Sequence, residues 1–246
     1  MTDPTRVLTL RLAGPLQSWG GTSRFTTRGT NAEPTKSGIV GMLAAAQGRR
    51  RVDPVEDLAS LRLGVRIERS GVLIHDFQTA SRPERKRGGA LSYAVMPLSS
   101  RHYLSDAVFL VGVEGPEGFI DELAEAIRRP RYPLSLGRRS CPPAGPVYCG
   151  VAEGTLEEML ATHPWLGAFP QGLRHPHEVP ARLQIARDVQ ANEPLVGLER
   201  EHDVPVSFDS AHRVFGWRWV KREWVDNPDA PSAVAGRGHD PFAEVG

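Results

Sequence analysis

The order of strand-like and helix-like segments in the first 150 residues is the strongest constraint on the fold of this chain. Three segments alternate or run apolar as strands do, and two repeat apolar residues at helical spacing. They are RVLTLRL (6–12), PTKSGIVGMLAAAQG (34–48), LRLGVRIE (61–68), DAVFLVGV (106–113) and PEGFIDELAEAIRRP (116–130). We predict an α+β domain with the strand and helix order of ferredoxin-like and RRM proteins.

An insertion at about 80–102 interrupts this order. ASRPERKRGG is followed by a second extended run, ALSYAVMPL, which predicts a protruding β-hairpin with a basic, glycine-containing tip. Like charges at the tip repel one another, so we expect mobility in the free chain and order beside a polyanion. A solvated surface loop is the alternative. The tip cations are Arg82, Arg85, Lys86 and Arg87.

The second half of the chain is less regular. We predict a ferredoxin-like domain over 1–150, a smaller β-rich part over 151–225 and a flexible tail over 226–246. VFGWRWVKREW in the β-rich part is interpreted either as core or as a docking edge. No apolar run long enough for a membrane helix and no signal peptide are seen, so we expect a cytoplasmic protein without a membrane partner.

Basic residues are unevenly distributed, although the formal net charge is only +1. Residues 1–51, 82–87 and 128–139 are rich in Lys and Arg, and the compensating acids lie mainly in 106–125 and 153–158. A nearly neutral chain of this kind can still carry a basic surface.

Gly38 and Gly41 lie inside the helix predicted at 34–48, and each costs about 1 kcal/mol of helix stability against alanine. Close packing against the helix backbone explains them better than helix propensity does. The first amides of a helix have no partner and attract anions, so Lys36, Ser37 and Gly38 are a candidate phosphate site. A packed helix is the alternative. Arg49, Arg50 and Arg51, at the far end of the helix, are expected to face a second RNA segment or a subunit, or to be solvated.

Four motifs in order resemble the CasD family, the Cas-five subunits of the type I-E CRISPR Cascade surveillance complex within the RAMP superfamily. They are GPLQSWG (14–20), PTKSGIVGMLAAAQG (34–48), HDFQT (75–79) and PLSLGRRSCPPAGPV (133–147). The resemblance implies a modified ferredoxin-like domain that grips the 5′ handle of the crRNA and caps the backbone filament. It also implies a thumb-like hairpin beside the guide, and no catalysis.

The implied partners are the large PAM-reading subunit and a backbone subunit, with target DNA reached only through the complex. No cofactor or metal is implied.

Residues in these motifs suit single-stranded RNA. Gln17 offers a hydrogen-bonding edge and Trp19 a stacking face, unless Trp19 is a core residue. Arg138, Arg139 and Ser140, expected at the end of a strand, are the preferred phosphate contacts, with a salt-bridged strand end as the alternative.

The main competing function is a metal-independent RAMP endoribonuclease that processes precursor crRNA. It requires a base, an acid and a cation on the phosphate. His75, His102, Tyr103 and Lys86 could supply them. A scaffold without RNA contact is a third possibility.

Two other features argue against metal or disulfide chemistry. HPHE at 175–178 is interpreted as a loop because its proline makes neighbouring side chains diverge. Cys141 and Cys149 lack the spacing of a zinc site, so we expect free thiols.

Overall fold

The computed structural model describes residues 4–20, 26–86, 88–168, 179–190, 193–194 and 196–231. Its helices are α1 (Lys36–Gln47), α2 (Glu56–Ser60), α3 (Glu117–Arg128) and α4 (Leu156–Thr162). Its strands are β1 (Thr5–Ala13), β2 (Leu16–Gln17), β3 (Thr27–Arg28), β4 (Arg62–Arg69), β5 (Val72–Gln78), β6 (Ser81–Arg85), β7 (Leu91–Val95), β8 (Ser99–Ser105), β9 (Val108–Pro116), β10 (Tyr148–Glu153), β11 (Arg182–Asp188), β12 (Leu198–Ser207) and β13 (Val214–Asp226). The prediction of a mixed α+β chain is confirmed.

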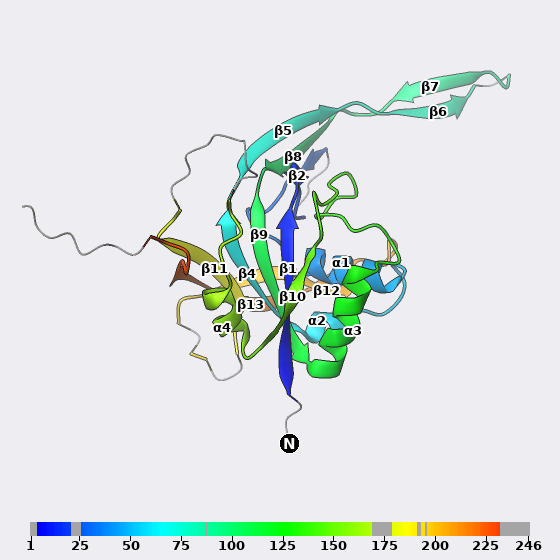
Figure 1. Ribbon diagram of the computed structural model, residues 1–246. Coiled ribbons are helices and arrows are strands. Elements are labelled where there is room, and N and C mark those ends of the chain that lie inside the picture. Colours follow the sequence, from blue (N-terminus) through cyan, green and yellow to red (C-terminus); the bar gives the residue numbers. More distant parts are fainter. Residues whose placement is uncertain are drawn as a thin grey trace, which may run out of the picture.

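A seven-stranded antiparallel sheet forms the body of the molecule, in the order β10-β1-β9-β4-β11-β13-β12 (Figure 1). The strands predicted at 6–12, 61–68 and 106–113 form β1-β9-β4, and β10 pairs with β1 at the edge. In the chain, α1 lies between β1 and β4, and α3 lies between β9 and β10. The C-terminal strands continue the same sheet, because β11 pairs with β4. The division at residue 150 therefore stays a prediction, and residues 232–246 of the expected tail lie outside the described residues.

Side-chain alternation divides the core between the two faces of the sheet. Leu8 and Leu10 of β1 and Phe109 of β9 belong to the large cluster that also contains residues of α1, α2 and α3. Val7 and Leu110, one position away, belong to a smaller cluster with α4. Neighbouring residues of a strand point to opposite faces, so each central strand supplies both clusters.

Two glycines let α4 approach its face of the sheet closely. Gly64 of β4 pairs directly with Gly112 of β9. A Cβ at Gly112 would come within 2.6 Å of Leu156, and a Cβ at Gly64 within 2.6 Å of Leu160. Helix α4 thus packs where the strands carry no side chain.

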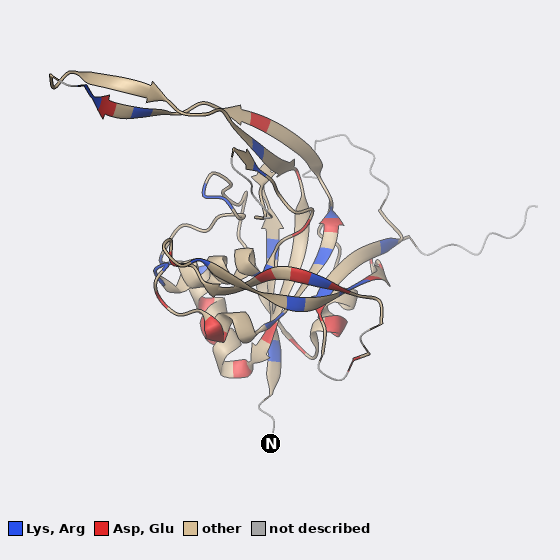
Figure 2. Ribbon diagram, turned by 180° about the vertical axis from the view of Figure 1, so that it is seen from behind, with Lys and Arg blue, Asp and Glu red and all other residues tan. Residues whose placement is uncertain are grey.

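The predicted insertion forms a long two-stranded arm (Figure 1). β5 pairs with β8 along its whole length, and β6 pairs with β7 farther out. Most of the arm is uncharged, with charged residues gathered near its outer end (Figure 2). β2 and β3 also pair with β8, so the base of the arm is a small separate sheet.

Helix α1 begins and ends where the sequence predicts. Thr35 is the N-cap and accepts a hydrogen bond from the amide of Gly38, and Gly48 ends the helix with φ of 81°. A Cβ at Gly38 would lie 2.8 Å from the indole of Trp19, whereas one at Gly41 would lie 3.7 Å from Phe208. Close packing therefore explains Gly38 but not Gly41.

Alanine at these two glycines should have opposite effects on stability. Both substitutions gain about 1 kcal/mol of helix propensity. Gly38→Ala would press a methyl group into the buried indole, at a cost of about 1–3 kcal/mol that exceeds this gain, so the variant should be less stable. Gly41→Ala meets only an ordinary contact and should stabilise the protein. Urea unfolding of both variants tests this, and equal shifts of the same sign would contradict it.

Candidate functional site

The predicted RNA contacts in the first loop are core residues. Gln17 is fully buried, and its Nε2 donates to the carbonyl oxygens of Leu12 at 3.2 Å and Ala107 at 2.7 Å. Trp19 is also fully buried and donates from Nε1 to Gln17 Oε1 at 3.1 Å. The prediction that they offer an edge and a stacking face is wrong for this conformation, because no surface of either side chain is open.

Lys36 is likewise occupied within the chain. Its Nζ lies 2.7 Å from Asp188 Oδ2, and its backbone N–H donates to Asp203 Oδ2 at 2.6 Å. Arg218 bonds to both carboxylates, to Asp188 at 2.6 Å and to Asp203 at 2.7 and 2.9 Å. We call Lys36, Asp188, Asp203 and Arg218 the charge cluster. It has two cations and two anions, and it leaves no free charge for a phosphate.

The start of α1 does attract an anion, as predicted, but the anion is the carboxylate of Asp203. Ser37 shares a hydrogen bond with the N-cap hydroxyl of Thr35 at 3.3 Å, and Gly38 packs on Trp19. The phosphate site predicted at Lys36, Ser37 and Gly38 is therefore filled by the protein itself.

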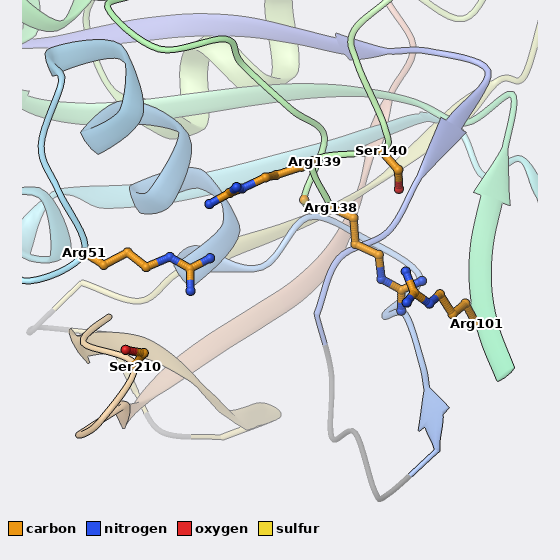
Figure 3. A pocket seen from close by; sticks show the side chains of 7 residues that line it. Arg51, Arg101, Arg138, Arg139, Ser140 and Ser210 are labelled. Atoms are coloured by element: carbon orange, nitrogen blue, oxygen red, sulfur yellow. The ribbon is translucent and has the colours of Figure 1, made fainter. Parts of the chain in front are cut away.

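Four arginines, of which Arg51 and Arg139 are exposed and Arg101 and Arg138 half-buried, instead line a groove of about 780 Å³ (Figure 3). Arg51 follows α1, Arg101 lies on β8, and Arg138 and Arg139 lie in the loop between α3 and β10. Figure 3 shows the side chains of Arg101 and Arg138 together at one end and those of Arg51 and Arg139 at the other. The remaining lining residues are Gly137, Ser140 and Ser210.

The groove contains cations without acids. Among the described residues, Arg51, Arg101 and Arg139 form no salt bridge, and no Asp or Glu lines the groove. The Nε of Arg101 is buried and has no hydrogen-bond partner in the described part of the chain. Arg49 and Arg50, by contrast, are paired with Asp57 and Asp53. An anionic ligand is the natural complement of such a surface.

Arg138 has a different role from Arg139. Its guanidinium donates to the carbonyl oxygens of Arg28 at 2.8 Å, Gly29 at 3.2 Å and His102 at 3.3 Å, and lies 4.9 Å from the ring centre of Tyr103. It thereby joins the loop before α1 to the base of the arm.

The expected strand end is wrong for this stretch. Arg138, Arg139 and Ser140 lie in a loop, in which Arg139 and Ser140 are exposed.

The arm carries its cations openly. Arg82, Arg85 and Lys86 are exposed, and Arg82 pairs with Glu84 at 2.6 Å. Arg87 lies outside the described residues.

The groups required for a nuclease are not brought together. His75 and His102 pair across β5 and β8, with ring centres 4.8 Å apart, and His75 also contacts Ser100. Tyr103, the next residue on β8, is buried on the other face. Lys86 lies at the outer turn of the arm, eleven residues beyond His75 along extended strands, or about 36 Å away.

Neither a metal-binding cluster nor a membrane-spanning helix is found in the described residues. The described residues contain no cluster of His, Cys, Asp and Glu that could hold a metal ion, and residues 169–178, which include HPHE, lie outside them. In the described part of the chain no helix has both the length and the apolar character needed to cross a bilayer. Cys141 and Cys149 are free, and burial raises the pKa of both thiols.

Sequence reasoning missed the two outer members of the groove. Arg51 was assigned to a helix end and Arg101 to no role, although both line the groove with Arg138 and Arg139. Ser210 arrives from the turn between β12 and β13, far away in the sequence. The run of three arginines at 49–51 was a signal for Arg51, but only the fold places Arg51 beside Arg139.

Residues 7–221 match the family model described as CRISPR-associated protein (Cas_Cas5). The chain belongs to this Cas5 family. A curated relative, the CRISPR system Cascade subunit CasD of Escherichia coli (strain K12), is 34% identical over 162 residues, which cover 60% of this chain and 72% of the relative. The resemblance seen in the sequence motifs is therefore confirmed.

Two solved structures resemble this Cas5-family chain over most of its length. One, titled as the crystal structure of a Cas protein, is 37% identical with a TM-score of 0.68, and the match covers 92% of this chain and 97% of that one. The other comes from a CRISPR RNA-guided surveillance complex and is 32% identical with a TM-score of 0.69, covering 91% of both chains.

Two carboxylates that pair with cations, Asp188 of the charge cluster and Glu193, should make the stability of the protein depend on pH. Burial alone would raise the pKa of Asp188, but Lys36 and Arg218 outweigh it and lower that pKa. Hydrogen bonds from Arg187 lower the pKa of Glu193 from 4.5 to about 2, against a smaller opposing effect of burial. Both groups bind protons more weakly in the folded state, so their contribution is complete above about pH 5 and is lost as the pH falls towards 2.

We expect the free energy of unfolding, measured in urea, to fall over this range. Asp188→Asn should lower it by about 3 kcal/mol or more at pH 7 and reduce its pH dependence, because two cations lose their shared partner. Asp226→Asn, at an exposed carboxylate of β13, is the control and should change neither quantity. An unchanged pH dependence in Asp188→Asn would contradict this account.

Replacement of Arg138 by lysine should destabilise the loop before α1. A single ammonium cannot reproduce the planar fork that reaches three carbonyl oxygens. Both Arg138→Lys and Arg138→Ala should therefore increase hydrogen exchange in residues 26–31 and cost about 1–3 kcal/mol of stability. Arg139→Ala should leave exchange there unchanged, and a Lys variant that behaves as wild type would show that only charge matters.

Proposed function

We propose that this protein is a non-catalytic RNA-binding subunit of a type I-E CRISPR Cascade surveillance complex. In this role it grips the 5′ handle of the crRNA and caps the backbone filament in defence against foreign DNA. The observation that carries the proposal is the groove lined by Arg51, Arg101, Arg138 and Arg139 without any acid. Membership of the Cas5 family and the similarity to the Cascade subunit CasD support it.

The distribution of ion pairs favours this groove over other basic regions. Arginines elsewhere, such as Arg62, Arg187 and Arg222, each contact two or more carboxylates. Their charge is neutralised by these carboxylates inside the molecule. The groove concentrates cations that remain available for phosphates, which dominate the affinity of nucleic-acid binding.

The proposal also covers the type of domain that the N-terminal part forms. The strand order β10-β1-β9-β4 with α1 and α3 as connections supports a ferredoxin-like, RAMP-type domain over residues 1–150. We interpret the arm as the thumb, and β11 to β13 as the main elements of the β-rich C-terminal part.

The large PAM-reading subunit and a backbone subunit are the proposed partners, with target DNA met only in the complex. We place the protein in the cytoplasm and assign it no cofactor. Precursor cleavage is the weaker alternative, because Lys86 lies far along the arm from His75 and His102.

Binding to an RNA that carries the repeat-derived 5′ handle should depend steeply on salt. Arg139 is exposed and forms no salt bridge among the described residues. Arg139→Ala should therefore weaken RNA binding. It should also reduce the slope of log affinity against log salt by about 0.7, the value for one phosphate of a single strand. Arg129→Ala, at an exposed arginine that pairs with Glu125 at the end of α3, is the control and should preserve the slope.

The same incubation without metal tests the alternative. Intact RNA after binding supports a non-catalytic subunit. Specific cuts that disappear in His75→Ala or His102→Ala would overturn it, and a slope unaffected by Arg139→Ala would remove the groove as the phosphate site.

A further inference from the structure

The outer part of the sheet carries two exposed tryptophans on one face. Trp217 and Trp219 are two residues apart on β13, so both point to the same side, about 7 Å apart. Their exposed fractions are 57% and 42%, large for indoles in regular strands. Helix α4 covers this side of the sheet at β4 and β9, and it leaves the tryptophans uncovered.

Cationic and imidazole groups from β12 contact both rings. The guanidinium of Arg200 lies 4.7 Å from the ring centre of Trp217 and 5.4 Å from that of Trp219. His202 stacks on Trp217 with ring centres 4.5 Å apart, and its Nε2 is 3.0 Å from the carbonyl oxygen of Phe215. We call His202, Trp217, Arg200 and Trp219 the aromatic column.

The column is positively charged. Among the described residues, neither Arg200 nor the nearby Arg213, which lies 5.5 Å from the ring centre of Phe215, has a carboxylate partner. The acids of β12 are directed elsewhere, since Glu199 and Glu201 bind Arg222 on the opposite face. Aromatic rings beside unpaired guanidinium groups are the elements that non-specific sites for single-stranded nucleic acid use.

One turn of the chain connects the column to the arginine groove, which lies beyond the end of α1 and so on the other face of the sheet. Residues 208–213 connect β12 to β13, and Ser210 in this turn lines the groove. Arg213 and Phe215 follow directly after the turn and precede Trp217 in the chain. An RNA strand that leaves the groove and passes round this turn would meet cationic and aromatic side chains next.

We propose that the aromatic column is a second binding site for single-stranded RNA, on which nucleotides adjoining those held in the groove stack. This rests on the proposed function, because it continues the same RNA. Acidic protein segments share part of this chemistry, but the unpaired Arg200 and Arg213 and the continuity with the groove favour RNA. Bases of any identity can stack on indole, so the site should read length and not sequence.

Two RNAs and one double variant test the site. The probes are a short handle RNA that fills the groove and the same RNA extended by uridines at either end. For the wild type, extension should raise affinity and quench tryptophan fluorescence. Trp217→Ala with Trp219→Ala should abolish the quenching and weaken binding of one extended RNA by about tenfold or more, while binding of the short RNA stays unchanged.

Trp224→Ala is the matched control. Trp224 is 56% exposed on the same strand. It lies five residues from Trp219, and this odd spacing places it on the other face of the sheet. The Trp224→Ala variant should therefore retain the effect of extension. Thermal unfolding of each variant confirms that the fold is kept.

Three results separate the outcomes. Equal affinities of wild type and double variant for every RNA would overturn the column as an RNA site. Normal RNA binding with failure to assemble with co-expressed Cascade subunits would assign it to protein docking and also overturn it. Failure of the wild type to bind the short RNA would refute the groove as the phosphate site. Quenching of tryptophan fluorescence by the extended RNA would in that case still support the column.

Discussion

The charge cluster joins the start of α1 to the three C-terminal strands of the sheet. Lys36 and its backbone amide reach carboxylates of β11 and β12, and Arg218 of β13 bridges those carboxylates. Asp188 also accepts from the amide of Leu63 on β4, so helix and sheet meet at one anion. Removing one partner of such a buried set leaves the others unpaired in a low dielectric, so the four charged groups depend on one another.

The same cluster determines which cations remain free. Once α1 is fixed at its start by Asp203, its other end carries Arg51 towards the loop that contains Arg139. The turn between β12 and β13 follows the same strands to the groove and supplies Ser210. The internal ion pairs and the exposed arginines are thus two results of one placement of the C-terminal strands against α1.

Local patterns were sufficient for the elements but not for the site. Alternation and capping located β1, α1, β9 and α3, because those signals depend on neighbours in the sequence. They could not show that Lys36 meets an acid 152 residues away, or that Trp19 fills the space left by Gly38. Arg138 and Arg139 were recognised as a pair, yet adjacent arginines in a loop differ only through what the fold brings beside them.

The arm limits the concentration at which the free chain can stay in solution. Within the described residues β6 and β7 pair only with each other, and an isolated two-stranded ribbon is of marginal stability in water. Leu91, Tyr93 and Val95 are exposed along it, so its open edges and apolar side chains invite self-association. Synthesis in excess of whatever covers the arm would favour aggregation, and balanced stoichiometry would be a condition for solubility.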